Sequence, residues 1–172
     1  MSKTMRFFTI LLWIAFLSCL YLVFYLSFQE GEAAKEVGKD YIYILAQKYY
    51  GVENIPDEVM LTFTYKIRQI GRIGIFTLLA LLGTSVVHAT FHNWLWIIRS
   101  IMAGSFLLGV AVFTERYKIY LPTRHFSEKE MLYSIAGAML GFGIVSIMTG
   151  VFGLVKWLAS LVIWAFKVGR SE

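Results

Sequence analysis

Four long runs without charged side chains constrain this chain more than any other feature of its sequence. They extend from Phe7 to Phe28, from Ile73 to Thr90, from Trp94 to Thr114 and from Met131 to Val155, and only Arg99 interrupts one of them. An α-helix needs about 20 consecutive, mostly apolar residues to cross the hydrocarbon layer of a bilayer. The sequence therefore predicts four membrane-spanning helices.

The composition excludes the other broad classes of protein. Apolar residues make up 58% of the 172 residues and charged residues 16%, whereas a soluble domain has roughly 45–50% and about 25%. Intrinsic disorder is excluded because it requires low hydrophobicity and high net charge. The net charge of +5 comes from basic residues between the apolar runs, which favours contacts with membrane lipids over nucleic acid. The single cysteine, Cys19, excludes a disulfide framework.

We expect one all-α polytopic membrane domain over residues 1–172, with spans at about 7–28, 70–90, 94–114 and 131–153. If the last span continued as one helix to Lys167, it would be roughly 55 Å long, against about 30 Å of hydrocarbon. We therefore predict a break at Gly150 and Gly153, followed by an interfacial helix over 155–168 that tryptophans and lysines anchor. The alternative is a tilted span that continues into water or a partner.

The connections between the spans differ in length. Residues 29–69 and the segment from Glu115 to Glu130 are long, whereas Thr90 to Asn93 leaves room only for a tight hairpin. With four crossings, both long connections lie on one side, and the termini and the hairpin lie on the other. In the first connection, Gly51 should end one helix and Pro56 should precede the next.

The orientation follows from the flanks of the first span. Lys3 and Arg6 precede it and glutamates follow it, which predicts cytoplasmic termini and an extracytoplasmic loop 29–69 in a bacterial plasma membrane. A simple count of Lys and Arg favours the reverse orientation, because ten of them lie on the side of the two long connections, namely Lys35, Lys39, Lys48, Lys66, Arg68, Arg72, Arg116, Lys118, Arg124 and Lys129.

The segment from Glu115 to Glu130 is the most informative for function. It joins two spans, so both glutamates lie near the headgroup level, where a charge needs a partner or access to water. Arg124 is the natural partner because a guanidinium binds carboxylate or phosphate in a bidentate manner. Glu130 also fits a helix cap with Ser127. The candidate ligand-binding residues are Glu115, Arg124, Glu130, Arg68, Arg72 and Lys118.

This segment resembles the signature of the VanZ-like family of bacterial membrane proteins. The matching positions are Glu115, Tyr120, Pro122, Arg124, Gly137 and Gly141. The family usually has Asp at position 130, Gln at 118, and Asn or Asp at 134. An earlier family motif, Arg-Lys-x-x-His-Phe with a nearby Glu, is matched at Arg68, with Gln69, Arg72 and Ile75 standing for the Lys, His and Glu. The resemblance covers roughly residues 65–143 and implies an association with reduced susceptibility to teicoplanin and related glycopeptides.

The leading hypothesis is a VanZ-like cell-envelope protein whose outer-face cluster binds an anionic lipid-linked phosphate headgroup or limits the access of a glycopeptide antibiotic. Glu115 and Arg124 would form the core pair, Glu130 would orient Arg124, and Arg68 and Arg72 would add positive potential. The alternative interpretation is that the same residues form a purely structural network of salt bridges. Two further alternatives are a non-catalytic accessory subunit of a larger membrane complex and, less favoured, an enzyme acting on a lipid phosphate with Glu115 or His125 as acid or base.

Other residues give weaker signals. Ser134, Gly137 and Gly141 form a small-residue ridge that favours close helix packing, inside the chain more than between chains. His88 and His92 are four residues apart, but no Cys, Asp or Glu nearby completes a metal site. Standard catalytic and cofactor-binding motifs are absent from the sequence. We therefore expect no catalytic residue, metal or cofactor.

Overall fold

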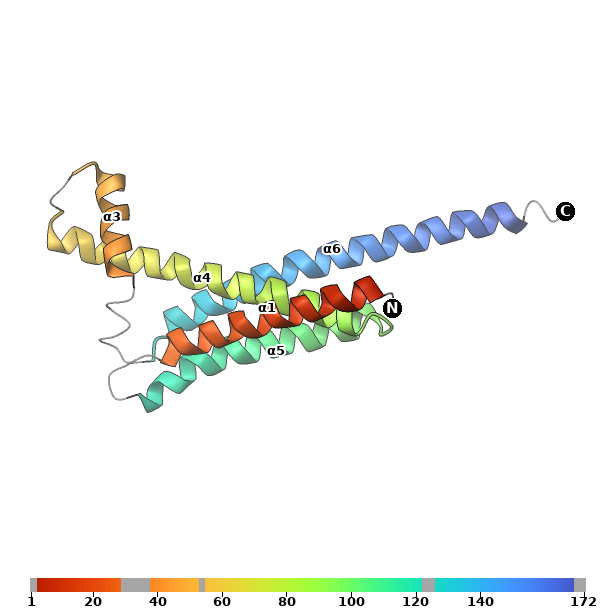
Figure 1. Ribbon diagram of the computed structural model, residues 1–172, viewed down its shortest axis with the longest axis horizontal. Helices are drawn as coiled ribbons and strands as arrows, with labels where there is room; N and C mark the ends of the chain where they lie inside the picture. Colours follow the sequence, from red (N-terminus) through yellow and green to blue (C-terminus); the bar gives the residue numbers. More distant parts are fainter. Residues whose placement is uncertain (1–2, 29–37, 53–54, 122–125, 169–172) are drawn as a thin grey trace.

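The structure is a computed structural model that describes residues 3–28, 38–52, 55–121 and 126–168, with residues 164–168 described by their backbone alone. Within these residues all regular secondary structure is helical (Figure 1). The elements are α1 (Lys3–Phe28), α3 (Lys39–Tyr50), α4 (Asp57–Thr90), α5 (Trp96–Arg116), the 3-10 helix η1 (Tyr117–Tyr120) and α6 (Glu128–Val168). Four helices are long and apolar enough to cross a membrane, namely α1, α4, α5 with η1, and α6. The predicted all-α fold with four such helices is confirmed.

The four long helices pack side by side as a bundle (Figure 1). α4 and α6 form the most extensive contact, α5 packs against both, and α1 covers α4 and α5. Apolar side chains from all four helices meet in one core, which consists of Phe16, Cys19, Val23, Phe76, Leu79, Ala80, Val86, Leu107, Val110, Ala111 and Ala138. Many other large apolar side chains point outward, as expected for helices that face lipid.

Small residues bring α6 into backbone contact with α4. A Cβ atom added at Gly137 would meet the carbonyl oxygen of Ile73, and one added at Gly141 would meet that of Thr77. The hydroxyl of Thr77 donates to the carbonyl of Gly137 across the interface, at 3.1 Å. Ser134 is fully buried on the same helix. The predicted small-residue ridge thus faces inward and is covered by α4.

The two ends of the bundle differ in how the chain connects its helices. At the hairpin end, residues 91–95 join α4 to α5 through a turn in which the backbone N–H of Trp94 donates to Phe91. The indole of Trp13 donates to Thr90 at this end (3.1 Å). At the loop end, α1 and α5 finish and α6 begins (Figure 1). Both long connections belong to the loop end, as the sequence predicts.

α4 extends beyond the bundle at the loop end, and α3 packs on this extension (Figure 1). Pro56 precedes α4, and Asp57 and Glu58 occupy its first turn, where carboxylates interact favourably with the helix dipole. Gly51 ends α3 with a positive φ of 68°, a conformation that glycine adopts at no steric cost. The predicted helix boundaries at Gly51 and Pro56 are confirmed.

The predicted break in the last helix is wrong. α6 runs as one helix from Glu128 to Val168 through Gly150 and Gly153. The indole ring of Trp96 packs over Gly150 and donates to Thr149 (3.2 Å). Beyond this contact every side chain from Val151 to Ile163 is exposed, and the helix projects past the bundle (Figure 1). A helix that is apolar on most sides tolerates two glycines without bending, each at a cost of about 1 kcal/mol relative to alanine.

Helix lengths place the two ends of the bundle one hydrocarbon thickness apart. From Arg72 to Thr90, α4 rises about 27 Å at 1.5 Å per residue, close to the ~30 Å of a bilayer core. The tryptophans of the hairpin end, Trp13, Trp94 and Trp96, are partly exposed, as is typical of side chains at the membrane interface. In a bilayer crossed by these helices, Arg72 would therefore lie near the opposite headgroup level.

Candidate functional site: a charged ring at the loop end

Four charged side chains form a closed ring at the loop end of the bundle. Arg72 binds Glu115 through Nη1 and Glu130 through Nη2, the latter at 2.9 Å. The ammonium group of Lys118 binds Glu115 Oε2 and Glu130 Oε2, each at 2.8 Å. Each cation thus contacts both carboxylates, and the formal charges within the ring cancel. We call Arg72, Glu115, Lys118 and Glu130 the charged ring.

The ring has a buried side and an accessible side. The side chains of Glu115 and Lys118 are 2% and 3% exposed, whereas those of Arg72 and Glu130 are 23% and 32% exposed. A buried charge is tolerated only when it is paired and hydrogen-bonded. The two buried members satisfy this condition through each other, and both oxygens of Glu115 are occupied by cations. Access from outside is therefore through Arg72 and Glu130.

Each member of the ring comes from a different local structure. Arg72 lies inside α4, where that helix enters the bundle, Glu115 is in the last turn of α5, and Lys118 belongs to η1. The tighter winding of a 3-10 helix brings Lys118 back towards Glu115, three residues earlier. Glu130 is in the first turn of α6. The ring therefore ties together three helices where they reach the membrane surface.

Glu130 has a second role at the start of α6. Its backbone N–H points to the Ser127 hydroxyl at 3.5 Å, the arrangement expected for an N-cap serine with its third helical residue. Its carboxylate meanwhile binds Arg72 and Lys118. The predicted cap is therefore made by the backbone of Glu130, whereas its carboxylate contacts Arg72 and Lys118; the predicted contact with Arg124 falls outside the described residues.

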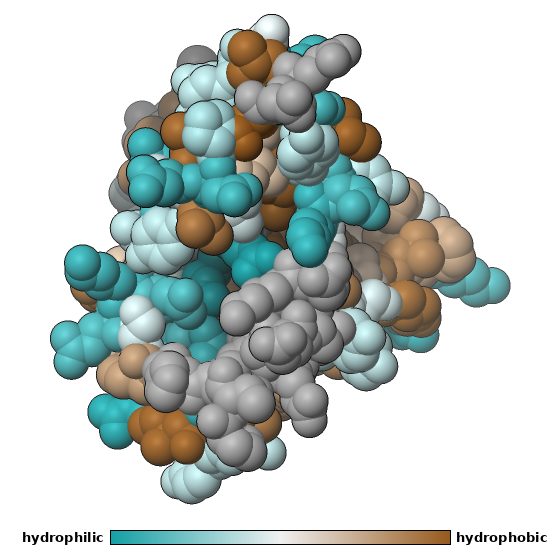
Figure 2. Space-filling view, turned by 90° about the vertical axis from the view of Figure 1, so that its left-hand side faces the viewer, coloured by the Kyte–Doolittle hydropathy of each residue, from teal (hydrophilic) through white to brown (hydrophobic). Residues whose placement is uncertain are grey.

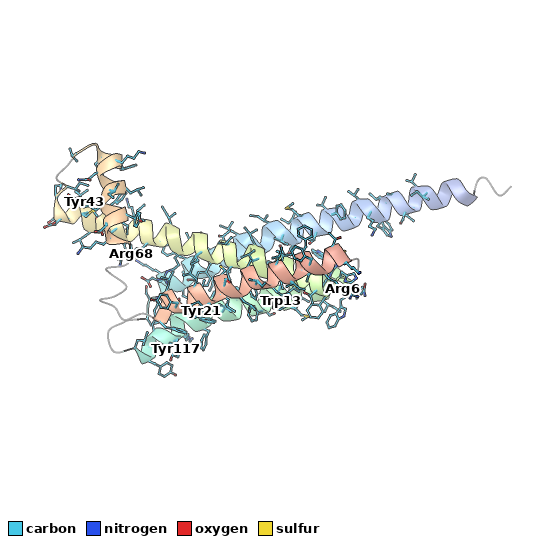
Figure 3. The ribbon with its side chains drawn as sticks, viewed as in Figure 1. Arg6, Trp13, Tyr21, Tyr43, Arg68 and Tyr117 are labelled. Carbon is cyan, nitrogen blue, oxygen red and sulfur yellow. The ribbon has the colours of Figure 1, made fainter. Side chains whose placement is uncertain are left out.

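The surface of the loop end is hydrophilic and hollowed. Figure 2 looks onto this end and shows hydrophilic side chains gathered in a recess. Above the bundle, α3 and the extension of α4 form one wall (Figure 1). Figure 3 shows Arg68 on α4 where α3 lies beside it, and Tyr117 on the opposite side of this end.

The structure brings together four of the six predicted ligand-binding residues. Glu115, Glu130, Arg72 and Lys118 are in mutual contact. Arg68 is one helical turn before Arg72 and partly buried. Arg124, together with His125, lies outside the described residues. Within the described part of the chain, the partners of Glu115 are therefore Arg72 and Lys118. Arg72 forms an ion pair with Glu115, whereas the sequence analysis expected it only to add positive electrostatic potential.

Sequence reasoning missed a second polar cluster, near the hairpin end. Thr84, His88, Ser100 and Ser146 are buried between α4, α5 and α6, and their side chains have no hydrogen-bond partner in the structure. We call these four residues the polar layer. Apart from His88, which the sequence paired with His92, their only sequence signal is a small polar residue on the inner face of each helix, which also fits ordinary close packing.

The other residues of interest near the hairpin end are His92 and Arg99. His92, four residues after His88, is exposed, and no group of three His, Cys, Asp or Glu side chains that could hold a metal ion occurs among the described residues. Arg99 donates from Nη1 to the backbone carbonyl of His88 at 3.3 Å. It therefore satisfies one of the last carbonyls of α4.

Fold and site together define an all-helical protein with four helices able to cross a membrane and a neutral charged ring at one surface. Comparisons with protein-family models, with curated proteins and with solved structures find no match to the chain.

Proposed function

We propose that this is a VanZ-like protein of the bacterial cell envelope that binds an anionic, lipid-linked headgroup at the charged ring. The observation that carries the proposal is the position of Glu130. One of its oxygens, Oε2, is shared by Arg72 and Lys118, and its side chain is the most exposed of the ring. A phosphate oxygen prefers the same two donors.

Binding would proceed by exchange of one anion for another. The phosphate would displace the Glu130 carboxylate from Arg72 and Lys118, and the carboxylate would turn into the hydrophilic recess. Glu115 would remain in place and keep both cations oriented. Charge-assisted hydrogen bonds of this type contribute about 1.5–3 kcal/mol each, which is enough to compensate for the pair that is lost.

The charge around the ring favours an anionic ligand. Lys66 and Arg116 are exposed at the loop end, and Arg68 lies one turn from Arg72. Because the ring itself is neutral, these surrounding cations supply the attractive potential that brings an anionic headgroup to the recess. A headgroup held there would limit the access of a glycopeptide of the teicoplanin type to its target, which is the role that the family resemblance suggests.

Lipid counting by native mass spectrometry tests this proposal. The full-length protein is released from nanodiscs of phosphatidylcholine that contain a minor fraction of a polyprenyl diphosphate, for the wild type, Arg72→Gln and the control Arg6→Gln. We expect roughly tenfold weaker retention of the diphosphate lipid in Arg72→Gln, equivalent to the loss of one charge-assisted contact. Retention should be unchanged in Arg6→Gln, because Arg6 lies near the start of α1, at the opposite end of the bundle from the ring. Equal retention in all three proteins would overturn the proposal.

The proposal places the loop end on the outer face and the termini in the cytoplasm. In a Cys19→Ser background, Tyr120→Cys at the loop end and Asn93→Cys in the hairpin introduce single exposed thiols. A membrane-impermeant thiol reagent should label Tyr120→Cys in intact cells and Asn93→Cys only after permeabilisation. The reverse pattern would place the ring in the cytoplasm and remove any direct role against antibiotics.

The interfacial location proposed for residues 155–168 requires α6 to bend after Gly150, because in the structure the helix continues without a break. About 30 Å after Glu130, at 1.5 Å per residue, α6 reaches Gly150, so the rest of the helix would lie beyond a hydrocarbon layer of about that thickness. Lys156, Ser160 and Lys167 fall within one narrow helical face, as suits a helix lying along the interface. The test uses a variant in which Trp157 is the only tryptophan and the other tryptophans are replaced by Phe. Lipids brominated near the headgroup should quench the fluorescence of Trp157 more than lipids brominated near the ends of their acyl chains.

The same exposed segment favours the second candidate function, a non-catalytic accessory subunit. A membrane-protein partner would contact the apolar side chains from Val151 to Ile163, since the glycine ridge is already covered by α4. Deletion of residues 151–172 should leave the bundle folded and abolish co-purification of a partner in mild detergent. Retention of the partner by the shortened chain would exclude this surface.

A further inference from the structure

We propose that the polar layer and Arg99 form a second site, which binds an anion near the hairpin end of the bundle. The site is separate from the charged ring, about one hydrocarbon thickness away, and does not depend on the function proposed for the ring. Its ligand is an anionic acceptor group, either a small inorganic anion or the phosphate of a lipid whose headgroup lies beside Trp96.

The hydroxyl groups of the layer differ from other buried or partly buried hydroxyls of the bundle. Thr77, Ser85, Thr114, Ser134 and Thr149 each donate to a backbone carbonyl one turn earlier in their own helix. Thr84, Ser100 and Ser146 make no such bond, although they are between 0% and 8% exposed. A buried polar group without a partner costs free energy that a bound ligand can recover.

The packing register places these groups at one level. On α5 and α6, Trp96 contacts Gly150 and Phe142 contacts Gly104. Ser100 and Ser146 lie midway between these two contacts, so they face each other. On α4, the carbonyl of His88 accepts from Arg99, which precedes Ser100. Thr84 and His88 share a face of α4 because they are four residues apart.

The charge of the site favours an anion. Within the described residues Arg99 forms no ion pair, and its Nε atom is buried without a partner. The described part of the three helices has no Asp or Glu from Arg72 to Trp94, from Trp96 to Thr114 or from Met131 to Ile163. Arg99 and the three hydroxyls can all donate hydrogen bonds, and Arg99 lies in the first turns of α5, near the positive end of that helix. A cation would find no carboxylate here, whereas an anion finds a guanidinium.

The site lies close to the hairpin surface. Ser100 is only four residues, about 6 Å, inside Trp96. Arg99 is half-buried and its neighbour Trp96 is exposed. A small anion would need to pass only this short distance from water, and the flexible side chain of Arg99 would carry its guanidinium towards a lipid phosphate at the interface.

Thermal unfolding in matched salts tests the proposal. The full-length protein in a neutral maltoside detergent is unfolded in sodium gluconate, sodium chloride and sodium phosphate at equal ionic strength, as wild type, Ser146→Ala, Arg99→Gln and the control Ser85→Ala. We expect chloride or phosphate to raise the Tm of the wild type and of Ser85→Ala by a few degrees relative to gluconate. The rise should be absent in Ser146→Ala and Arg99→Gln.

Lipid nanodiscs distinguish the two sources of the anion. If Tm in gluconate is higher in phosphatidylglycerol than in phosphatidylcholine, and Ser146→Ala removes this difference, the lipid phosphate is the ligand. If Arg99→Gln does not fold, Ser146→Ala decides alone, because alanine preserves the helix. An anion-dependent rise that persists in Ser146→Ala would overturn the proposal. So would a Tm of Ser146→Ala above that of the wild type in every salt, which is the behaviour of a hydroxyl buried without any ligand.

Discussion

The charged ring and the polar layer involve the same three helices and lie near opposite ends of the bundle. They differ in whether their buried polar groups have hydrogen-bond or ion-pair partners. In the ring, each cation meets two carboxylates and the formal charges cancel. In the layer, the hydroxyls and the imidazole of His88 have no partner among the described residues, and neither has the Nε atom of the adjacent Arg99.

This difference separates two kinds of binding. A satisfied ring is stable without a ligand, so a ligand must displace one of its members, and Glu130 is the accessible one. An unsatisfied layer gains from any ligand that completes its hydrogen bonds. The ring is therefore expected to contribute stability on its own, whereas the layer should contribute stability only when it is occupied.

The largest expected effect comes from breaking the ring at its buried member. Glu115→Gln removes the negative charge that Arg72 and Lys118 share and leaves a net positive charge in a buried position. We expect the free energy of unfolding to fall by about 3–5 kcal/mol, measured by unfolding in mixed SDS and maltoside micelles. Glu128→Gln, at an exposed position in the first turn of α6, should cost less than about 1 kcal/mol. Equal effects of the two substitutions would mean that the ring is not a buried ion network.

The comparison also depends on close contact of α4 with α6 between the two clusters. Gly137→Ala introduces a Cβ against the carbonyl of Ile73 and should lower the free energy of unfolding by about 1–3 kcal/mol. Gly143→Ala is the matched control, since nothing lies within 4 Å of its added Cβ. It should leave stability unchanged or raise it by up to about 1 kcal/mol, because alanine favours the helix. If both variants behaved alike, the glycine ridge would not be a packing contact.

A smaller effect is expected where α5 holds α6 at the hairpin surface. Trp96→Phe keeps a ring over Gly150 but removes the hydrogen bond to Thr149. The loss should be about 0.5–1.5 kcal/mol in the same unfolding measurement. Trp94→Phe, whose indole is exposed in the hairpin turn, serves as the control. A larger loss in Trp94→Phe than in Trp96→Phe would show that this contact does not position the polar layer.

The sequence predicted the class of fold because charge-free runs of about 20 residues have few alternatives. It placed Glu115 and Glu130 correctly at helix ends, since charged residues bounded the runs. It named Arg124 as the partner of Glu115, whereas the partners among the described residues are Arg72 and Lys118. Arg72 reaches this carboxylate from a helix distant in sequence, and only the packing of α4 against α5 brings the two together.

Two other features could not be predicted from the sequence, for physical reasons. The continuity of α6 through Gly150 and Gly153 depends on its contact with Trp96 and on propensity costs too small to force a bend. The polar layer was missed because a serine in an apolar helix normally bonds to its own backbone. Whether it does so is decided by local rotamers, and Ser146 differs in this respect from Ser134 in the same helix.

The central claim is that Glu130 occupies the position of a ligand phosphate and competes with it. The most direct measurement is the affinity of Glu130→Gln for a polyprenyl diphosphate in phosphatidylcholine nanodiscs, compared with wild type. Removal of the competing carboxylate leaves Arg72 and Lys118 with one unmatched positive charge, so the variant should bind the diphosphate more tightly, by roughly tenfold, although it unfolds more easily. Unchanged or weaker binding would contradict the claim and leave the ring as a structural network of salt bridges.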